Sequence, residues 1–345
     1  MVRNHWSRLG NVRPGLTRKL VLYCGGVAAP LALTGILLWR AGVFDKFWFW
    51  TVSYARQYAL EIPFSGGMEL LRGTIPGVVG PNGAIWLTAA AGLILVSWKK
   101  VWWKKDDRET ALFLAGLLFF SFLAVCPGFY FREHYFVLML PAVALLAGGA
   151  VSAVSRMMPG AWWHHAVYCG VLVFSVMQQK EFLFRMTPAQ VSRTMYGTNP
   201  FPEAVQIADY IRTHSTKNAR IAVLGSEPEI PFYADRRSAT GYIYTYGLME
   251  PQPFAMKMQT EMIQELAASR PEFVVFVGIH TSWLRRPDSP PVLFDWWRIY
   301  GPQHYRLAGI IDIVAADRTV YRWEDVEAYK PQSENLIAVY KRTGS

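Results

Sequence analysis

The sequence predicts a polytopic α-helical membrane region of about five spans, followed by an external α/β domain. Hydrophobic residues make up 52% of the 345 residues and charged residues only 17%, which is not the balance of an ordinary soluble protein. Long uncharged runs fill residues 1–179, whereas residues 180–345 have the mixed apolar and polar pattern of a compact domain. The first part carries 16 Lys and Arg against 7 Asp and Glu, and the second carries 19 against 18.

Five uncharged runs have about the length of a membrane-spanning helix, roughly 17 to 25 residues. They cover residues 20–39, 83–98, 110–131, 135–155 and 157–178. The second run is the shortest, because prolines and glycines crowd its start. We expect the first run to be an uncleaved anchor rather than a signal peptide, because its apolar core is long and no small-residue cleavage pattern follows it.

The basic residues predict the orientation of these spans. Five Lys and Arg precede the first run, and five more stand between the second and the third. Such clusters are typical of cytoplasmic loops, so the N-terminus is expected in the cytoplasm and residues 180–345 outside. Cations that punctuate apolar segments also argue against a nucleic-acid partner, which would need them gathered on a soluble face.

The predicted external segment 41–82 begins with a dense group of aromatic residues, which prefer the level of the lipid headgroups. Residues 47–60 then mix aromatic side chains with Arg56, Gln57 and neighbouring polar groups. This pattern predicts a helix that lies along the membrane surface.

The remaining residues, 180–345, predict a two-layer or three-layer α/β domain with a mainly parallel sheet. Its expected strands are 220–224, 273–278, 305–314 and 335–340, with a further extended segment at 239–246. Its expected helices are 202–214, 254–268 and 294–300, and residues 225–229 make a turn into another helix. Ser226 and Glu229 have the spacing of a helix capping box.

Several chemical classes have no motif in this chain. It contains no phosphate-binding glycine loop, no HExxH, no GxSxG and no CxxC. The three cysteines lie in apolar runs, and His164 and His165 would diverge on a helix, so neither group suggests a metal site. No cofactor is predicted, and no pattern supports a divalent metal.

The most informative stretch lies between the third and fourth runs. There Arg132, Glu133, His134 and Tyr135 bring a guanidinium, a carboxylate, an imidazole and a phenol together at the membrane surface. Arg132 and His134 could bind a phosphate headgroup. The alternative interpretation is that the cluster only anchors the helix ends in the interface.

A second candidate is the alternating series Tyr242, Tyr244 and Tyr246. On a strand these residues would place three rings on one face, where they could stack against sugar rings. The interpretation that we favour is that they are ordinary half-buried strand residues.

The run from Gly128 to Ala147, with its His134-Tyr135 turn and Pro141, resembles the later spans of the GT-C superfamily of membrane glycosyltransferases, which includes protein O-mannosyltransferases and aminoarabinose transferases. Further stretches resemble the external C-terminal domain of a bacterial branch: Asn199-Pro-Phe, Val223-Leu-Gly-Ser-Glu-Pro-Glu-Ile, Arg236-Arg-Ser-Ala-Thr and Met249-Glu-Pro-Gln-Pro. The resemblance implies a bacterial inner-membrane enzyme that transfers a sugar from a polyprenyl-phosphate donor to a lipid, glycan or protein on the outer face.

The resemblance covers the later half of such an enzyme. The family's catalytic base is an acidic residue in the first external loop, and no residue here matches that motif, although Asp45 and Glu61 lie in the first external segment. We therefore expect a separate N-terminal half or partner subunit. The alternative is a non-catalytic membrane-anchored module whose external domain binds glycan or a partner. A transporter is disfavoured because the spans contain almost no ionisable residue.

Overall fold

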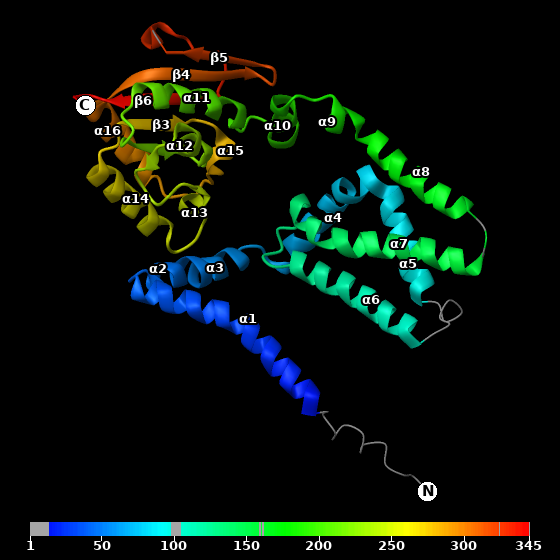
Figure 1. Cartoon of the computed structure of the whole chain (residues 1–345). Coiled ribbons are helices and arrows are strands. Elements are labelled where there is room, and N and C mark those ends of the chain that lie inside the picture. Colours follow the sequence, from blue (N-terminus) through cyan, green and yellow to red (C-terminus); the bar gives the residue numbers. More distant parts are fainter. Residues whose placement is uncertain (1–13, 98–104, 159, 161, 324, 345) are drawn as a thin grey trace. The chain divides into compact units, whose positions relative to one another are not determined.

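The structure, a computed structural model, describes residues 14–97, 105–158, 160, 162–323 and 325–344. The chain divides into two compact units, Met1–Gln178 and Gln179–Ser345. The described part of the first unit contains only helices, and that of the second contains helices and a sheet (Figure 1).

The described part of the first unit is helical, as the sequence predicted. It consists of α1 (Pro14–Arg40), α2 (Phe44–Trp48), the π-helical segment η2 (Phe49–Tyr54), α3 (Ala55–Ala59), α4 (Phe64–Val79), the 3-10 segment η3 (Gly80–Asn82), α5 (Gly83–Ser97), α6 (Lys105–Val125), the 3-10 segment η5 (Glu133–Met139), α7 (Leu140–Met157) and α8 (Trp163–Gln178).

Among the described residues, four helices are long and apolar enough to cross a membrane: Thr17–Arg40, Phe64–Leu95, Arg108–Val125 and Glu133–Met157. They overlap the first four predicted runs. Helix α8 lies in the fifth run but has only 16 residues and is not one of the four, so a fifth span is not confirmed.

Residues 44–59 are helical throughout, as expected for the segment 47–60. Helix α4 was not predicted, because its four glycines and Pro76 suggested irregular structure. Glycine and proline are, however, more frequent in membrane helices than in soluble ones. The chain changes direction at η3, between α4 and α5 (Figure 1).

Helices α5 and α7 pack closely through small residues. Gly92 on α5 lies so near α7 that a Cβ atom added to it would be 1.9 Å from the Leu146 carbonyl oxygen. Ala89 on α5 and Ala147 and Ala150 on α7 are buried. Small residues allow helix backbones to approach in this way in membrane proteins. At the other end of α7, Ser155 Oγ lies 2.6 Å from Nε2 of the buried His164 on α8.

The second unit contains a six-stranded mixed sheet in the order β2-β1-β3-β6-β4-β5. Its strands are β1 (Arg220–Leu224), β2 (Arg237–Ser238), β3 (Phe273–Val277), β4 (Tyr305–Ala315), β5 (Arg318–Arg322) and β6 (Leu336–Arg342). Strands β2, β1 and β3 are parallel, whereas β6 is antiparallel to both β3 and β4, and β5 is antiparallel to β4. The prediction of a mainly parallel sheet is therefore wrong, because β4, β5 and β6 form only antiparallel pairs.

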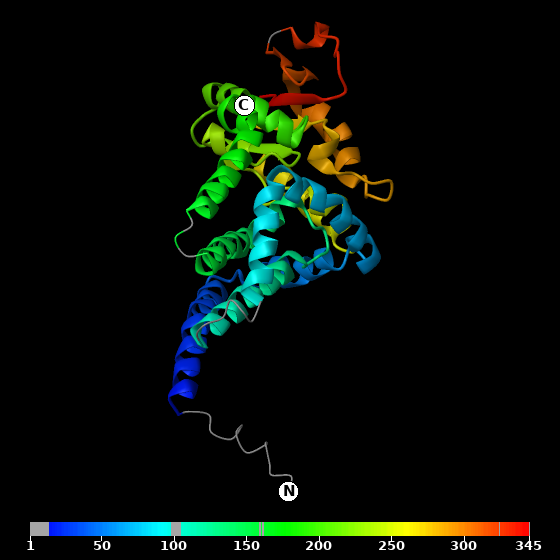
Figure 2. The ribbon, with the colours of Figure 1, turned by 90° about the vertical axis from the view of Figure 1, so that its right-hand side faces the viewer.

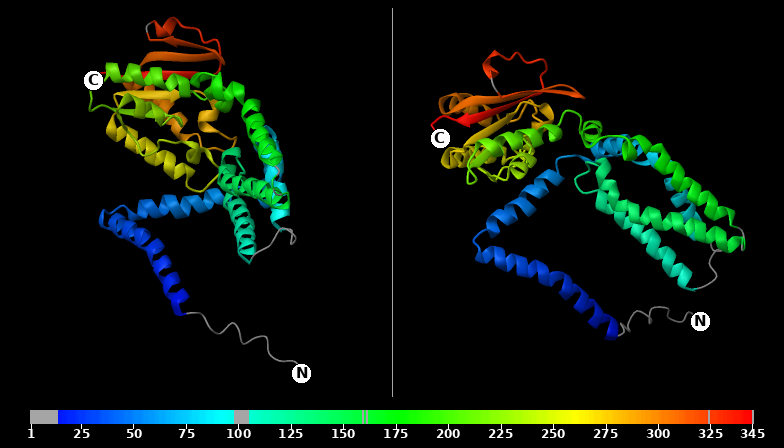
Figure 3. Two further views of the ribbon diagram at one scale, coloured as in Figure 1. Left: turned by 45° about the vertical axis from the view of Figure 1, so that its right-hand side comes forward. Right: turned by 45° about the horizontal axis from the view of Figure 1, so that its top comes forward.

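The helices of this unit are α9 (Lys180–Phe184), α10 (Pro188–Tyr196), α11 (Phe201–His214), α12 (Glu229–Ala234), α13 (Tyr246–Met249), α14 (Ala255–Ser269), α15 (His280–Trp283) and α16 (Val292–His304), with a 3-10 turn η6 (Val326–Ala328). Helices α11 and α12 share a core with alternate residues of β1 and β3, including Ile221 and Val275. On the other face, Phe294 and Trp297 of α16 contact Phe276 and Tyr340. The sheet therefore lies between two helical layers (Figures 2 and 3).

Candidate functional site

The segment Pro127–Tyr135, called the turn from here on, joins α6 to η5 through an unusual backbone. Gly128 has φ 77°, Phe129 has φ 54° and Phe131 has φ 43°. Positive φ is unfavourable for a residue with a side chain, and such residues cluster at functional sites. A phenylalanine side chain does not itself stabilise a backbone with positive φ, so packing around the two rings must stabilise the turn.

That packing comes from the two phenylalanine rings. Phe131 is only 1% exposed and belongs to the core of the first unit. The ring of Phe129 makes an edge contact with Phe64 on α4, with 5.8 Å between the centroids. A Cβ atom added to Gly67 would be 2.6 Å from Phe129 Cβ, so glycine is needed where α4 meets the turn. The turn is thus shaped by a contact with a helix that the sequence did not predict.

Tyr130 connects the turn to the end of α3. Its hydroxyl donates a hydrogen bond to Oε2 of Glu61. Its ring stacks on Tyr58, with 4.6 Å between centroids and an interplanar angle of 13°. On the same ring, the Arg132 guanidinium lies 5.4 Å from the centroid. A carboxylate, two phenols and a guanidinium thus form one connected group.

The other predicted residues of the turn lie around this group. The Glu133 carboxylate lies against α4, where a Cβ atom added to Gly77 would be 2.1 Å from Oε1. The rings of His134 and Tyr135 make an edge contact at 4.7 Å and line a cavity of about 360 Å³. The remaining lining of the cavity is apolar: Ala124, Val125, Pro127, Val137 and Leu138.

These contacts suggest what the turn could bind. Arg132 and His134 are exposed, and a guanidinium and an imidazole can both donate hydrogen bonds to a phosphate. An apolar cavity beside them suits a hydrocarbon chain. Among the described residues, no group of three His, Cys, Asp or Glu side chains could hold a metal ion.

Sequence reasoning placed Asp45 and Glu61 together as acidic candidates, and the structure separates them. Glu61 is part of the connected group at the turn. Asp45 lies on α2 beside a different cavity of about 480 Å³, lined with Phe44, Trp48 and Phe49. Within the described residues, no hydrogen bond or ion pair links Asp45 to the turn.

In the second unit, the three tyrosines do not lie in a row. The strand expected at 239–246 is absent: residues 239–245 form an irregular loop with several bends, and α13 begins at Tyr246. Tyr242 is buried, and its hydroxyl donates to Oε2 of Glu261 over 2.8 Å. Tyr244 and Tyr246 remain neighbours, with 4.4 Å between their centroids. The prediction of three rings on one face is therefore wrong.

The loops that follow the parallel strands meet in a buried polar group, called the Ser226 cluster: Ser226, Glu227, Thr245 and Ser282. Ser226 Oγ lies 3.0 Å from Thr245 Oγ1, and Ser282 Oγ donates to Glu227 Oε2 over 2.8 Å. Burial raises the pKa of Glu227 to about 8. Ligands of open α/β sheets commonly bind beyond the carboxyl ends of the strands. Here protein side chains occupy that position.

The Ser226 cluster also corrects the predicted capping box. Helix α12 begins at Glu229 with Pro228 at its N-cap, and no side chain caps it. Ser226 Oγ instead accepts a hydrogen bond from the Thr245 backbone N–H over 3.0 Å. No local sequence signal could have found this contact, because it joins residues from two loops.

No model of a known protein family matches the chain, and no curated protein matches it either.

Proposed function

We propose that the chain is a membrane glycosyltransferase, or the C-terminal part of one, that uses a polyprenyl-phosphate-linked sugar. The observation that supports this most is the turn itself. Its strained backbone presents Arg132 on the ring of Tyr130, the residue that also binds Glu61. His134 lines an apolar cavity next to it. A charged group beside an apolar cavity suits a donor with a phosphate head and a hydrocarbon tail.

In the proposed reaction, Arg132 and His134 bind the donor phosphate, and the polyprenyl chain begins in the cavity. The acceptor hydroxyl oxygen forms a bond to the anomeric carbon of the sugar. The bond from that carbon to the phosphate oxygen breaks, and polyprenyl phosphate leaves with the electron pair. Glu61 takes the proton of the acceptor hydroxyl, and Arg132 stabilises the charge on the departing phosphate.

Transfer on the outer face requires the orientation inferred from the basic residues. We propose that the N-terminus is cytoplasmic, that the membrane is the bacterial inner membrane, and that Gln179–Ser345 is extracytoplasmic. Alkaline phosphatase fused to the C-terminus should be active, and a fluorescent protein that folds only in the cytoplasm should be dark there. The opposite pair of signals would contradict this orientation.

Donor binding is the first test. The full chain in lipid nanodiscs should bind a polyprenyl-phosphate hexose, and Arg132→Ala should weaken this binding by about 1.5 to 3 kcal/mol, the usual contribution of a hydrogen bond to a charged group. Arg72→Ala, which removes an exposed arginine from α4 of the same unit, is the matched control. Unchanged binding by Arg132→Ala would leave the turn as a helix-end anchor.

Sugar transfer to the acceptor is the second test, because it separates donor binding from removal of the acceptor's hydroxyl proton. Glu61→Gln should retain donor binding and lose transfer to the acceptor. If the chain transfers sugar only after an N-terminal half is supplied in trans, and Glu61→Gln does not affect the restored activity, then the base belongs to that partner. A chain that binds donor and transfers nothing under either condition would be a binding module rather than an enzyme.

A further inference from the structure

The second unit has a cationic cavity at the amino ends of β1 and β2. Its volume is about 680 Å³, within the range of small-molecule sites. The cationic residues that line it are Lys217, Arg220, Arg236 and Arg237, and Asp235 is the one acid among the lining residues. It is distinct from the turn, which lies in the first unit, and from the Ser226 cluster at the opposite ends of the strands.

Two of these cations are placed against each other by the sheet. Arg220 of β1 and Arg237 of β2 are partners in the parallel register. Neighbouring strands are about 4.8 Å apart, and like charges at directly opposed positions destabilise a sheet. Both residues are exposed, and neither side chain makes a hydrogen bond or ion pair among the described residues. An anion between the two guanidinium groups would relieve this repulsion.

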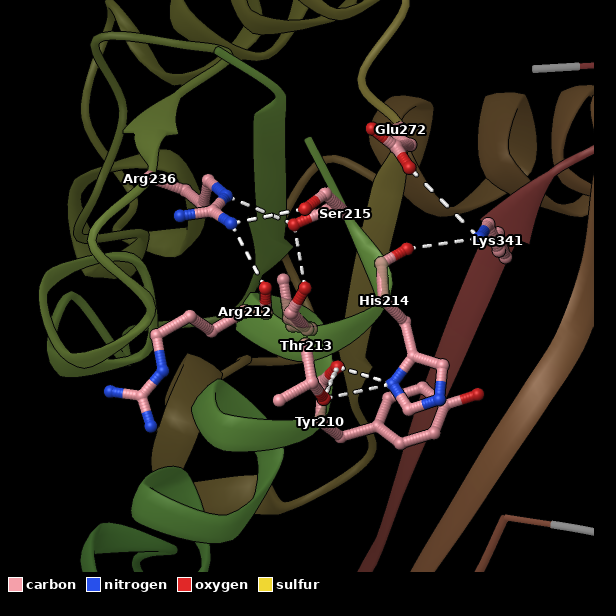
Figure 4. Close-up of polar contacts among 9 residues, drawn as sticks. Tyr210, Arg212, Thr213, His214, Ser215, Arg236, Glu272 and Lys341 are labelled. Carbon is pink, nitrogen blue, oxygen red and sulfur yellow. Dashed lines mark hydrogen bonds and ion pairs between the residues drawn. The ribbon is translucent and has the colours of Figure 1, made fainter. Parts of the chain in front are cut away.

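The carboxylate of Glu272, next to the other neighbouring strand β3, does not neutralise Arg220 and Arg237. Glu272 immediately precedes β3, and its backbone N–H donates to the Arg220 carbonyl over 2.9 Å. Its carboxylate is directed toward Lys341, with Oε1 4.0 Å from Nζ (Figure 4). Lys217, the third exposed cation at the cavity, also has no side-chain partner among the described residues. The local charge is therefore strongly positive.

Arg236 has a different role, because it builds the wall of the cavity. Its Nε donates to Ser215 Oγ over 2.9 Å, and one terminal nitrogen donates to the Arg212 carbonyl over 3.0 Å (Figure 4). The other terminal nitrogen donates to the Ala234 carbonyl over 3.1 Å. These bonds connect the end of α11 to the start of β2. The wall is thus held in place before any ligand arrives.

An exposed aromatic ring completes the cavity. Phe232 on α12 is 78% exposed and, with Pro231, supplies an apolar side beside the cations. Its ring makes an edge contact with Tyr233, with 5.5 Å between the centroids, and most of its surface still faces water. Exposed apolar surface is unfavourable, and the C–H face of a sugar ring is a flat apolar surface of matching size. We propose that this cavity binds an anionic saccharide, a hexose unit carrying a phosphate or a carboxylate. The guanidinium groups of Arg220 and Arg237 bind the anion, and Phe232 stacks on the sugar.

The test is titration calorimetry on the full chain in nonionic detergent, with mannose 6-phosphate, glucuronate, glucose, inorganic phosphate and AMP. We expect both anionic sugars to bind and glucose not to bind. The double variant Arg220→Ala/Arg237→Ala should weaken mannose 6-phosphate binding at least tenfold, and the corresponding double lysine variant should lose less. Phe232→Ala should weaken binding of mannose 6-phosphate and leave that of inorganic phosphate unchanged.

A cation of the same unit that lies away from the cavity is the control. Arg318→Ala removes an exposed cation of β5 and should not change the affinity for mannose 6-phosphate. Melting temperatures check the folding of each variant. Arg237→Ala should melt at the same temperature or higher in the absence of ligand, because a repulsion has been removed, whereas a structural arginine would give a lower value.

The outcomes that overturn the inference are specific. Unchanged affinity in the double alanine variant would exclude the arginine pair as the anion site. Tighter binding of AMP than of mannose 6-phosphate would make this a nucleotide cavity. Binding to phosphatidylglycerol vesicles that depends on the two arginines, with no binding of soluble sugars, would make it a lipid-headgroup site.

Discussion

The Tyr130 hydroxyl donates a hydrogen bond to Glu61 Oε2, and this bond joins two segments that are 69 residues apart in the sequence. Tyr130→Phe removes only the hydroxyl. A hydrogen bond to a charged group contributes about 1.5 to 3 kcal/mol, so we expect a clearly lower melting temperature in detergent. Tyr135→Phe is the matched control. If Tyr130→Phe is still as destabilising in a Glu61→Ala background, which has no acceptor at this position, the bond is not the cause.

Substitution of Gly92 should separate α5 from α7. Its added Cβ would be 1.9 Å from the Leu146 carbonyl oxygen and 3.2 Å from the Ala150 nitrogen, and backbone atoms cannot move aside as a flexible side chain can. Gly92→Leu should therefore lower the melting temperature strongly, with a loss of about 1 to 3 kcal/mol or more, as overpacking causes in other cores. Gly148→Leu on α7, where no atom lies within 4 Å, should be tolerated. Equal effects of the two substitutions would contradict this packing.

Glu227 should make the second unit less stable as the pH rises. Burial raises its pKa to about 8 from the ordinary glutamate value of 4.5, so the folded state binds a proton that the unfolded state has already lost between these values. Its contribution is fully present below about pH 4.5 and is lost as the pH rises to about 8, at no more than about 1.4 kcal/mol per pH unit.

The measurement is urea unfolding of the wild type and of Glu227→Gln between pH 4 and 9. Because the other titrating groups are common to both proteins, the difference between the two curves isolates Glu227. The free energy of unfolding of Glu227→Gln, relative to that of the wild type, should increase between about pH 4.5 and pH 8 and stay constant above pH 8. A difference that does not vary with pH would show that Glu227 is ionised in the folded protein.

A buried ion pair connects α10 to α11. Arg193 donates to Glu203 Oε1, and the two side chains are 9% and 2% exposed. Thr319 Oγ1 also donates to this carboxylate over 2.6 Å, and burial, with the charge of Glu203, raises the pKa of Tyr321 to about 12. Arg193→Ala leaves a buried charge without its cation, so the free energy of unfolding should fall by about 3 to 5 kcal/mol.

Arg185→Ala, which breaks an exposed pair with Glu181, is the control and should change stability by less than about 1 kcal/mol. The double variant Arg193→Met/Glu203→Met should recover much of the lost stability, because it removes both charges. If Arg193→Ala is no more destabilising than Arg185→Ala, the buried pair contributes little.

The sequence predicted the elements with a strong apolar pattern. Strands β1 and β3 begin and end within a residue of their expected positions, because burial on both sides of a sheet leaves a continuous apolar signal. Helix α11 was predicted equally well, because its apolar residues repeat at helical spacing. Strand β5, Arg318–Arg322, lies at the sheet edge and has no buried residue, and it was missed. Strand direction was also mispredicted, because apolar content does not tell whether a strand runs parallel or antiparallel.

The candidate site was predictable only in its local part. Residues 132 to 135 stand together in the sequence, so their grouping is visible without a structure. The contact of Tyr130 with Glu61, and that of Phe129 with Gly67, depend on α3 and α4, which meet the turn from far away in the chain. The alternation of the three tyrosines was misleading, because it is a local pattern and the conformation depends on a distant contact. The hydrogen bond from Tyr242 to Glu261 on α14 favours a buried ring in a bent loop.

The Ser226 cluster makes the second unit a candidate for chemical complementation. Glu227 Oε2 lies so close to Gly225 that an added Cβ there would be 2.3 Å away, so the carboxylate packs directly against the backbone after β1. Glu227→Gly would leave a small polar void with Ser282 Oγ still facing it. Acetic or propionic acid, which carries the deleted group as a free molecule, could occupy that void in its protonated form. A domain prepared in this way would report the acid concentration through its own melting temperature.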